Sequence, residues 1–123
     1  MKLTENDFEQ LVVDVLDSLP EKLLEMIDNV DVVIELRPTR EQLRHMGITS
    51  GTLYGLYEGI PLTLRDSGYS IVAPDKITIF QRPIEQECST PEEVADQVRT
   101  TVIHEVAHHF GIDEETLDEL GWS

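Results

Sequence analysis

Two histidines and a glutamate near the C-terminus have the types and the spacing of a metal site. His104, Glu105 and His108 form the pattern H-E-x-x-H, in which the histidines stand four residues apart. On an α-helix a step of four residues returns to within ~40° of the same face, so both imidazoles can reach one ion. Neutral imidazoles suit Zn²⁺, and a neighbouring carboxylate can take a proton from water that the ion activates. The pattern therefore indicates a metal-dependent hydrolase.

The residues after the motif favour a third ligand. Gly111 follows His108 by three residues, where a helix can end in the left-handed conformation that glycine tolerates best. The chain can then turn back toward the ion. Glu114 follows the glycine by three residues, at the position of the third ligand in the pattern H-E-x-x-H-x-x-G-x-x-H. We expect Glu114 to bind the ion, with Asp113 as the first alternative; the other acidic residues within reach are Glu115, Asp118 and Glu119.

The same residues have simpler interpretations. His104 and His108 could be core histidines, and Glu105 could be a carboxylate that only supports the site or lies on the surface. Burying two imidazoles and a carboxylate on a largely apolar helix without a metal or partners would cost several kcal/mol, so metal binding is the better interpretation. His109 lies ~140° around the helix from His104, and we expect it to miss the ion and to be exposed or hydrogen-bonded elsewhere.

Length and charge limit the classes of protein. The chain has 123 residues, and we expect residues 1–123 to form a single domain with a modest core. Its formal net charge of −16 argues against binding to nucleic acid or to an anionic membrane through charge. The single Cys88 excludes an internal disulfide. The N-terminus lacks the segments of a signal peptide and no apolar run could span a membrane, so we expect a cytoplasmic protein.

The elements that must position the motif begin with helices. Thr4 and Asp7 resemble a capping box, and apolar residues then recur at helical spacing as far as Leu19. Pro20 can occupy the first position of a second helical piece, which Asn29 ends. Both helices are interpreted as packing elements without chemistry.

The middle of the chain should supply short strands and one small helix. The helix is expected over 39–47, with a threonine cap and a terminal glycine. Gly55 indicates a bulge or a close approach of another backbone. Strands are expected at 30–36, in a hairpin over 49–64 that turns at Glu58-Gly59, at 69–72 and at 77–80.

The helix that carries the motif has clear start and stop signals. Thr90 offers an N-cap, Pro91 suits the first helical position and Glu93 completes a capping box. The helix should run to about Phe110 and be apolar over much of its circumference, hence mostly buried. We expect only a polar connection over 83–89 and a final short helix over 114–120. Helices and short strands together predict one α+β unit.

Several segments resemble the minimal zincins, a family of small bacterial proteins described as possible zinc metallopeptidases. The resemblance is carried by His104-Glu105-x-x-His108-His109-Phe110-Gly111-Ile112, by Leu117-Asp118-Glu119-Leu120-Gly121-Trp122, by 53–63, by 74–77 and by the opening helix that ends in Leu19-Pro20. It implies a compact zincin-like fold with a small mixed sheet packed on helices, and a site of two histidines and one acidic residue. The family often has Asp where this chain has Glu114, with Asp113 one residue earlier, so the third ligand stays open.

These observations predict a zinc metallopeptidase. Zn²⁺ on His104, His108 and Glu114 would polarise the scissile carbonyl, while Glu105 deprotonates the zinc-activated water. Expected partners are a peptide or protein substrate, with no nucleic acid and no membrane, and the expected state is a monomer or small homo-oligomer. The alternative is a non-catalytic interaction module with a structural or vestigial zinc site; a metal-dependent ribonuclease is disfavoured by the charge. Candidate oxyanion donors are Tyr54, Tyr57, Arg65 and Tyr69.

Overall fold

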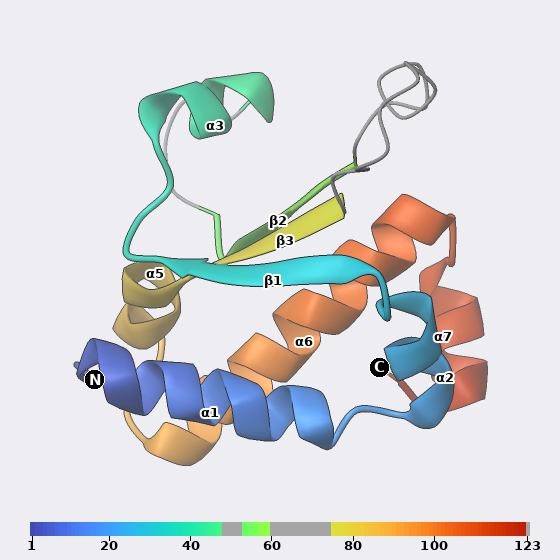
Figure 1. Cartoon of the computed structure of the whole chain (residues 1–123), viewed down its shortest axis with the longest axis horizontal. Helices are drawn as coiled ribbons and strands as arrows, with labels where there is room; N and C mark the ends of the chain where they lie inside the picture. Colours follow the sequence, from blue (N-terminus) through green and yellow to red (C-terminus); the bar gives the residue numbers. More distant parts are fainter. Residues whose placement is uncertain (48–52, 60–74, 123) are drawn as a thin grey trace.

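Short strands lie between helices along the chain in the computed structural model (Figure 1). The structure describes residues 1–47, 53–59 and 75–122. The helices are α1 (Glu5–Asp17), α2 (Glu21–Met26), α3 (Arg40–His45), α5 (Gln81–Gln86), α6 (Pro91–Phe110) and α7 (Glu114–Leu120), and the strands are β1 (Val30–Glu35), β2 (Gly55–Glu58) and β3 (Asp75–Phe80). The predicted α+β class is confirmed. Among the described residues, no helix combines the length and the apolar character needed to cross a membrane.

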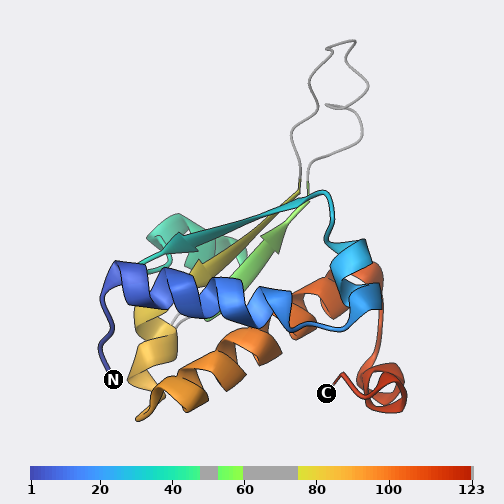
Figure 2. The same cartoon turned by 60° about the horizontal axis from the view of Figure 1, so that its bottom comes forward.

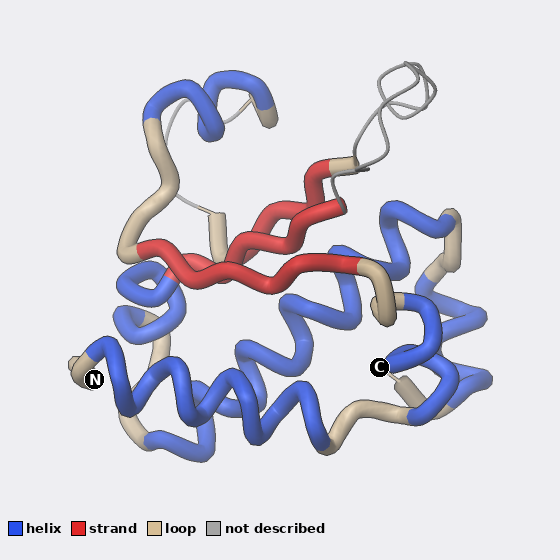
Figure 3. Tube along the Cα trace, viewed as in Figure 1, coloured by secondary structure: helices blue, strands red, loops and turns tan. Residues whose placement is uncertain are grey.

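The sheet is mixed, in the order β1-β3-β2 (Figure 3). β1 runs parallel to β3 with Val32 opposite Ile77, and β2 runs antiparallel to β3 with Tyr57 opposite the same isoleucine. The central position of β3 explains why its residues 77–80 are all buried. In the described part of the chain, β1 and β2 are therefore the two edges of the sheet.

α1 and α6 lie side by side on one face of the sheet (Figures 1 and 2). α1 turns Phe8, Val12 and Val15 inward, and α6 also packs against β2 and β3. Val98 is fully buried in the centre of α6. The apolar periodicity of both helices thus fills one core beneath the sheet. The expectation that α6 is mostly buried is only partly met, because seven of its 20 residues are buried, and Phe110 at its end is 46% exposed.

The predicted helix boundaries have most of the expected local chemistry, but the capping box at the start of α6 is only half formed, because Glu93 accepts the N–H of Ser89 and not that of Thr90. The hydroxyl of Thr90 accepts the N–H of Glu93 at 3.1 Å and starts α6, and Gly111 ends α6 in the left-handed conformation with φ 72°. Thr39 forms a full capping box with Gln42 at the start of α3. Pro20 is the N-cap of α2 and not its first helical residue, a difference of one position.

The middle of the chain contains a helix that was not expected. A polar connection without secondary structure was predicted over 83–89, but α5 occupies Gln81–Gln86, so the prediction is wrong for the first half of that segment. Pro83 is compatible with this helix since it lies in the first turn, where backbone N–H groups have no helical acceptor. Strands at 30–36 and 77–80 are confirmed. β2 supplies the first run of the expected hairpin; its second run and the expected strand at 69–72 lie outside the described residues.

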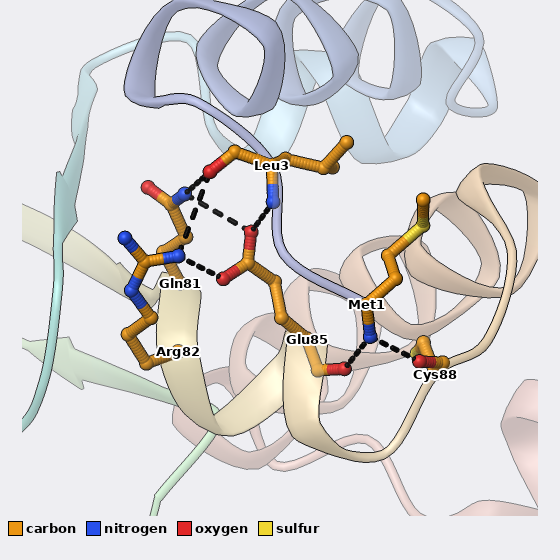
Figure 4. A network of polar contacts seen from close by, with 6 residues as sticks. All are labelled: Met1, Leu3, Gln81, Arg82, Glu85 and Cys88. Atoms are coloured by element: carbon orange, nitrogen blue, oxygen red, sulfur yellow. Dashed lines mark hydrogen bonds and ion pairs between the residues drawn. The ribbon is translucent and has the colours of Figure 1, made fainter.

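A buried carboxylate joins α5 to the start of the chain (Figure 4). Glu85 is 2% exposed, and its oxygens accept the backbone N–H of Leu3 at 2.7 Å and the guanidinium of Arg82 at 2.6 Å. The side-chain amide of Gln81 donates to the same carboxylate at 3.1 Å. Burial alone would raise the pKa of Glu85, but these hydrogen bonds hold the pKa below its ordinary value. The carboxylate therefore anchors the segment that leads into α1.

Candidate metal centre

The H-E-x-x-H residues occupy the C-terminal half of α6, on the part of its surface that the core does not cover. His104 and His108 are exposed and Glu105 is half-buried, whereas Val106 and Ala107 between them face the core. The three polar side chains border a surface depression of about 620 Å³ that also includes Gly111 and residues of α7. The two histidines are therefore not core histidines. They present their imidazoles at an open site that a solute can reach.

The turn after α6 brings α7 back beside the motif. At Gly111 the backbone adopts φ 72°, and the N–H of Ile112 donates to the carbonyl of Ala107 at 2.8 Å. α7 then begins at Glu114, whose Oε1 lies 3.8 Å from Nε2 of His104. The turn at Gly111 thus places Glu114, which the spacing favoured as a ligand, next to His104.

Asp113, the first alternative for that role, has a different contact. Its Oδ1 accepts the backbone N–H of Thr116 at 2.8 Å, so it is the N-cap of α7. Hydrogen bonds from Thr116 hold the pKa of Asp113 below its ordinary value. Its carboxylate is engaged at the start of α7, while that of Glu114 faces His104.

The donor set fits a zinc ion in its chemistry. Two imidazoles one helical turn apart and a carboxylate across the same depression are the ligands that Zn²⁺ takes in open sites. In the arrangement shown, no three His, Cys, Asp or Glu side chains of residues 1–47, 53–59 and 75–122 come close enough to hold an ion together. The side chains of His104 and Glu114 are 45% and 71% exposed and lie 3.8 Å apart at their nearest polar atoms.

Glu105 is held by the edge of the sheet. The backbone N–H of Tyr57 in β2 donates to Oε1 of Glu105 at 2.9 Å. Burial raises the pKa of the Glu105 carboxyl above its ordinary value, and the opposing effects of the Tyr57 N–H and of the His108 and His104 charges do not cancel the rise. An oriented carboxylate with a raised pKa beside two imidazoles has the properties of a general base.

β2 reaches Glu105 because a glycine lets the strand approach α6. A Cβ atom on Gly55 would lie 2.5 Å from Cγ2 of Thr101 and 3.2 Å from the carbonyl of Thr78. Any side chain at this position would require Thr101 or the strand to shift. The expectation of a close approach at Gly55 is confirmed, and the approaching group is a helix side chain as well as a strand backbone.

Sequence reasoning missed a second contact between β2 and α6. The ring of His109 stacks on that of Tyr57, with centroids 3.9 Å apart and planes 18° from parallel. The Tyr57 hydroxyl donates to Oδ2 of Asp75 at 2.8 Å, and Nε2 of His109 lies 3.8 Å from the same oxygen. His109 is exposed and points to β2, as expected for a residue that misses the ion. Nothing in the sequence indicated Asp75, because the strand pairing that places it here is long-range.

The candidate oxyanion donors are only partly described. The Tyr57 hydroxyl contacts Asp75, and the Tyr54 carbonyl accepts the N–H of Phe80 at 2.9 Å. Burial raises the pKa of Tyr54, which keeps its hydroxyl protonated. Tyr69 and Arg65 lie outside the described residues.

Comparison with known proteins agrees with this fold. The structure is similar to that of a conserved hypothetical protein from Thermus thermophilus, with a TM-score of 0.56 and 18% sequence identity, over 88% of this chain and 94% of that chain. At this identity the similarity concerns the fold alone. No curated protein matches the sequence. The model of a family described as zincin-like metallopeptidase matches residues 27–122, which include all three strands and the H-E-x-x-H helix. The chain therefore belongs to the zincin-like metallopeptidase family.

Proposed function

We propose that this protein is a zinc-dependent peptidase, in which His104, His108 and Glu114 hold the ion and Glu105 is the general base. The observation that carries the proposal is the 2.9 Å hydrogen bond from Tyr57 to Glu105, which orients a carboxylate of raised pKa beside both imidazoles. The 3.8 Å contact between His104 and Glu114 supports the choice of third ligand. Family membership supports the choice of peptides as substrates.

Glu105 has the proton-transfer role in this proposal. Zinc, when bound in such a site, supplies a Lewis acid that lowers the pKa of water and polarises a carbonyl group. The Tyr57 N–H holds Oε1 of Glu105, so we assign proton transfer to Oε2. Oε2 accepts a proton from the attacking water and delivers it to the amine that leaves when the peptide bond breaks.

Metal analysis and peptide hydrolysis test the proposal together. Protein purified without added zinc should contain about one zinc ion per chain, and His104→Ala should lose it. Glu105→Gln should keep the zinc but lower the rate of cleavage of a fluorogenic peptide library by roughly 10²–10⁴-fold, because the amide cannot accept the proton. Zinc-free protein whose thermal stability does not respond to added zinc would refute the metal site.

The second candidate is a non-catalytic interaction module that zinc stabilises. It is favoured by the high exposure of His104 and Glu114, and by the lack of a closed set of ligands within the described ranges. In that case zinc should raise the melting temperature of the protein, while neither the parent nor Glu105→Gln cleaves any peptide of the library. Cleavage by the parent that Glu105→Gln abolishes would exclude this alternative.

A further inference from the structure

The edge of the sheet formed by β1 is the edge opposite β2, the strand that contacts Glu105, and it borders a groove. β1 pairs with β3 on one side, and within the described ranges no strand pairs with its other side. Between β1 and α1 the surface is hollowed into a groove of about 470 Å³. Figures 1 and 2 both show α1 running beneath this strand. An extended segment laid along β1 would pair with the strand and cover the groove.

The lining of the groove is mostly apolar, and its charged residues are all acidic. Val13 of α1 and Leu36 after β1 line it and are 44% and 43% exposed, and Val33 of β1 also lines it. The charged residues of the lining are Glu5, Glu9 and Glu35, and the lining contains no lysine or arginine. An incoming strand that alternates apolar and basic side chains would match both features, because successive side chains of a strand point to opposite faces.

A buried acceptor without a partner lies in the same lining. Gln81 is 0% exposed, and its Oε1 has no hydrogen-bond partner in the described part of the protein. Its Nε2 donates at 3.1 Å to the Leu3 carbonyl and at 3.1 Å to Glu85, both acceptors, so the amide cannot be flipped. Figure 4 shows the amide oxygen turned away from Leu3 and Glu85. An unpaired buried oxygen is costly, and a donor from an occupant would relieve that cost where binding shifts the lining enough to uncover the oxygen.

We propose that the groove between β1 and α1 is a docking site for an extended, basic segment of another protein, which adds a strand to the free edge of β1. The acidic lining selects against a second copy of this chain, because a symmetric pair would bring Glu5, Glu9 and Glu35 of both copies together in molecules of net charge −16. The site is independent of zinc and of hydrolysis.

Synthetic peptides test the charge and the strand pairing separately. The probe is a blocked peptide of about nine residues with alternating valine and lysine, titrated into ¹⁵N-labelled protein. It should shift the amide signals of β1 and the side-chain amide signals of Gln81. A matched peptide with glutamate in place of lysine should not bind. A lysine peptide that is N-methylated at alternate residues keeps the charge but cannot pair, and it should bind weaker by on the order of tenfold or more.

A pair of charge-reversal variants locates the binding site. Glu9 in α1 and Glu21 in α2 are both exposed, but only Glu9 lines the groove. Glu9→Lys should weaken the lysine peptide by on the order of tenfold, whereas Glu21→Lys, with the same change in net charge, should change its affinity by less than about twofold.

Four outcomes of the peptide titrations would overturn the proposal. They are equal affinity of the lysine and N-methylated peptides, equal effects of the two charge reversals, shifts that spread over the surface, and no shift in β1 at millimolar lysine peptide. Sedimentation that shows a dimer, together with dilution-dependent β1 signals, would identify a second copy as the occupant and would also overturn it.

Discussion

The backbone N–H of Tyr57 and Oε1 of Glu105 are 2.9 Å apart, although the two residues are 48 positions apart in the sequence. Because of this hydrogen bond, the edge strand β2 and the motif helix α6 form one unit, and the orientation of the candidate base depends on how β2 is attached to α6. Two further contacts, at Gly55 and at His109, make that attachment, and each of them can be tested.

The stacking of His109 on Tyr57 should keep the hydrogen bond from the Tyr57 N–H to Glu105 formed. We predict that His109→Ala lets β2 move away from α6, so that the Tyr57 amide proton exchanges with solvent on the order of tenfold faster or more. The cost in stability should be about 1 kcal/mol, the usual value of an aromatic stack. His109→Phe keeps a stacking ring and should retain slow exchange. An unchanged exchange rate of the Tyr57 amide proton in His109→Ala would show that the stack has no such effect.

The glycine in β2 should be intolerant of a methyl group. Gly55→Ala places a Cβ 2.5 Å from Cγ2 of Thr101, and we predict a loss of about 1–3 kcal/mol in the free energy of unfolding, measured with urea. Thr101→Ser removes that methyl group, so the double variant should recover a large part of the loss. Additive effects of the two substitutions would show that the contact with Thr101 is not the cause.

The two acidic residues after Gly111 can be separated by their different contacts. Asp113→Asn keeps a side chain that can cap α7, so stability and zinc affinity should change little. Glu114→Gln removes the carboxylate beside His104 and should weaken zinc binding by at least ~tenfold in a calorimetric titration, since Zn²⁺ prefers a charged oxygen ligand. The reverse result would identify Asp113 as the ligand.

The buried carboxylate of Glu85 should make stability depend on pH. Its pKa in the folded protein lies below its ordinary value, so its contribution is fully present above the unfolded pKa of about 4.3 and is lost as the pH falls through the folded pKa. In Glu85→Gln the amide NH₂ group faces N–H groups that donate to the carboxylate in the parent protein, so donors face donors. The substitution should therefore lower the free energy of unfolding by about 1–3 kcal/mol at neutral pH. Glu87→Gln, in an exposed neighbour, should cost less than about 0.5 kcal/mol. Equal losses in the two variants would contradict this account.

Local signals in the sequence by themselves determined where the motif helix begins and ends and which residues share its face. A threonine cap, a proline at the first position and a glycine in the left-handed conformation act within a few residues, so the limits Pro91–Phe110 could be read before the fold was known. The same holds for β1, whose β-branched run is a local preference. The spacing of His104 and His108 likewise needs only the geometry of one helix.

The tertiary structure alone decided what surrounds that helix. The contact of Glu105 with Tyr57, the stack of Tyr57 on His109 and the approach of Glu114 to His104 depend on where β2 and α7 pack against α6. That packing is set by burial of apolar surface over the whole core, which is not directional and leaves no short pattern in the sequence. The metal-site motif is therefore a local property of this chain, and the positioning of its base is a global one.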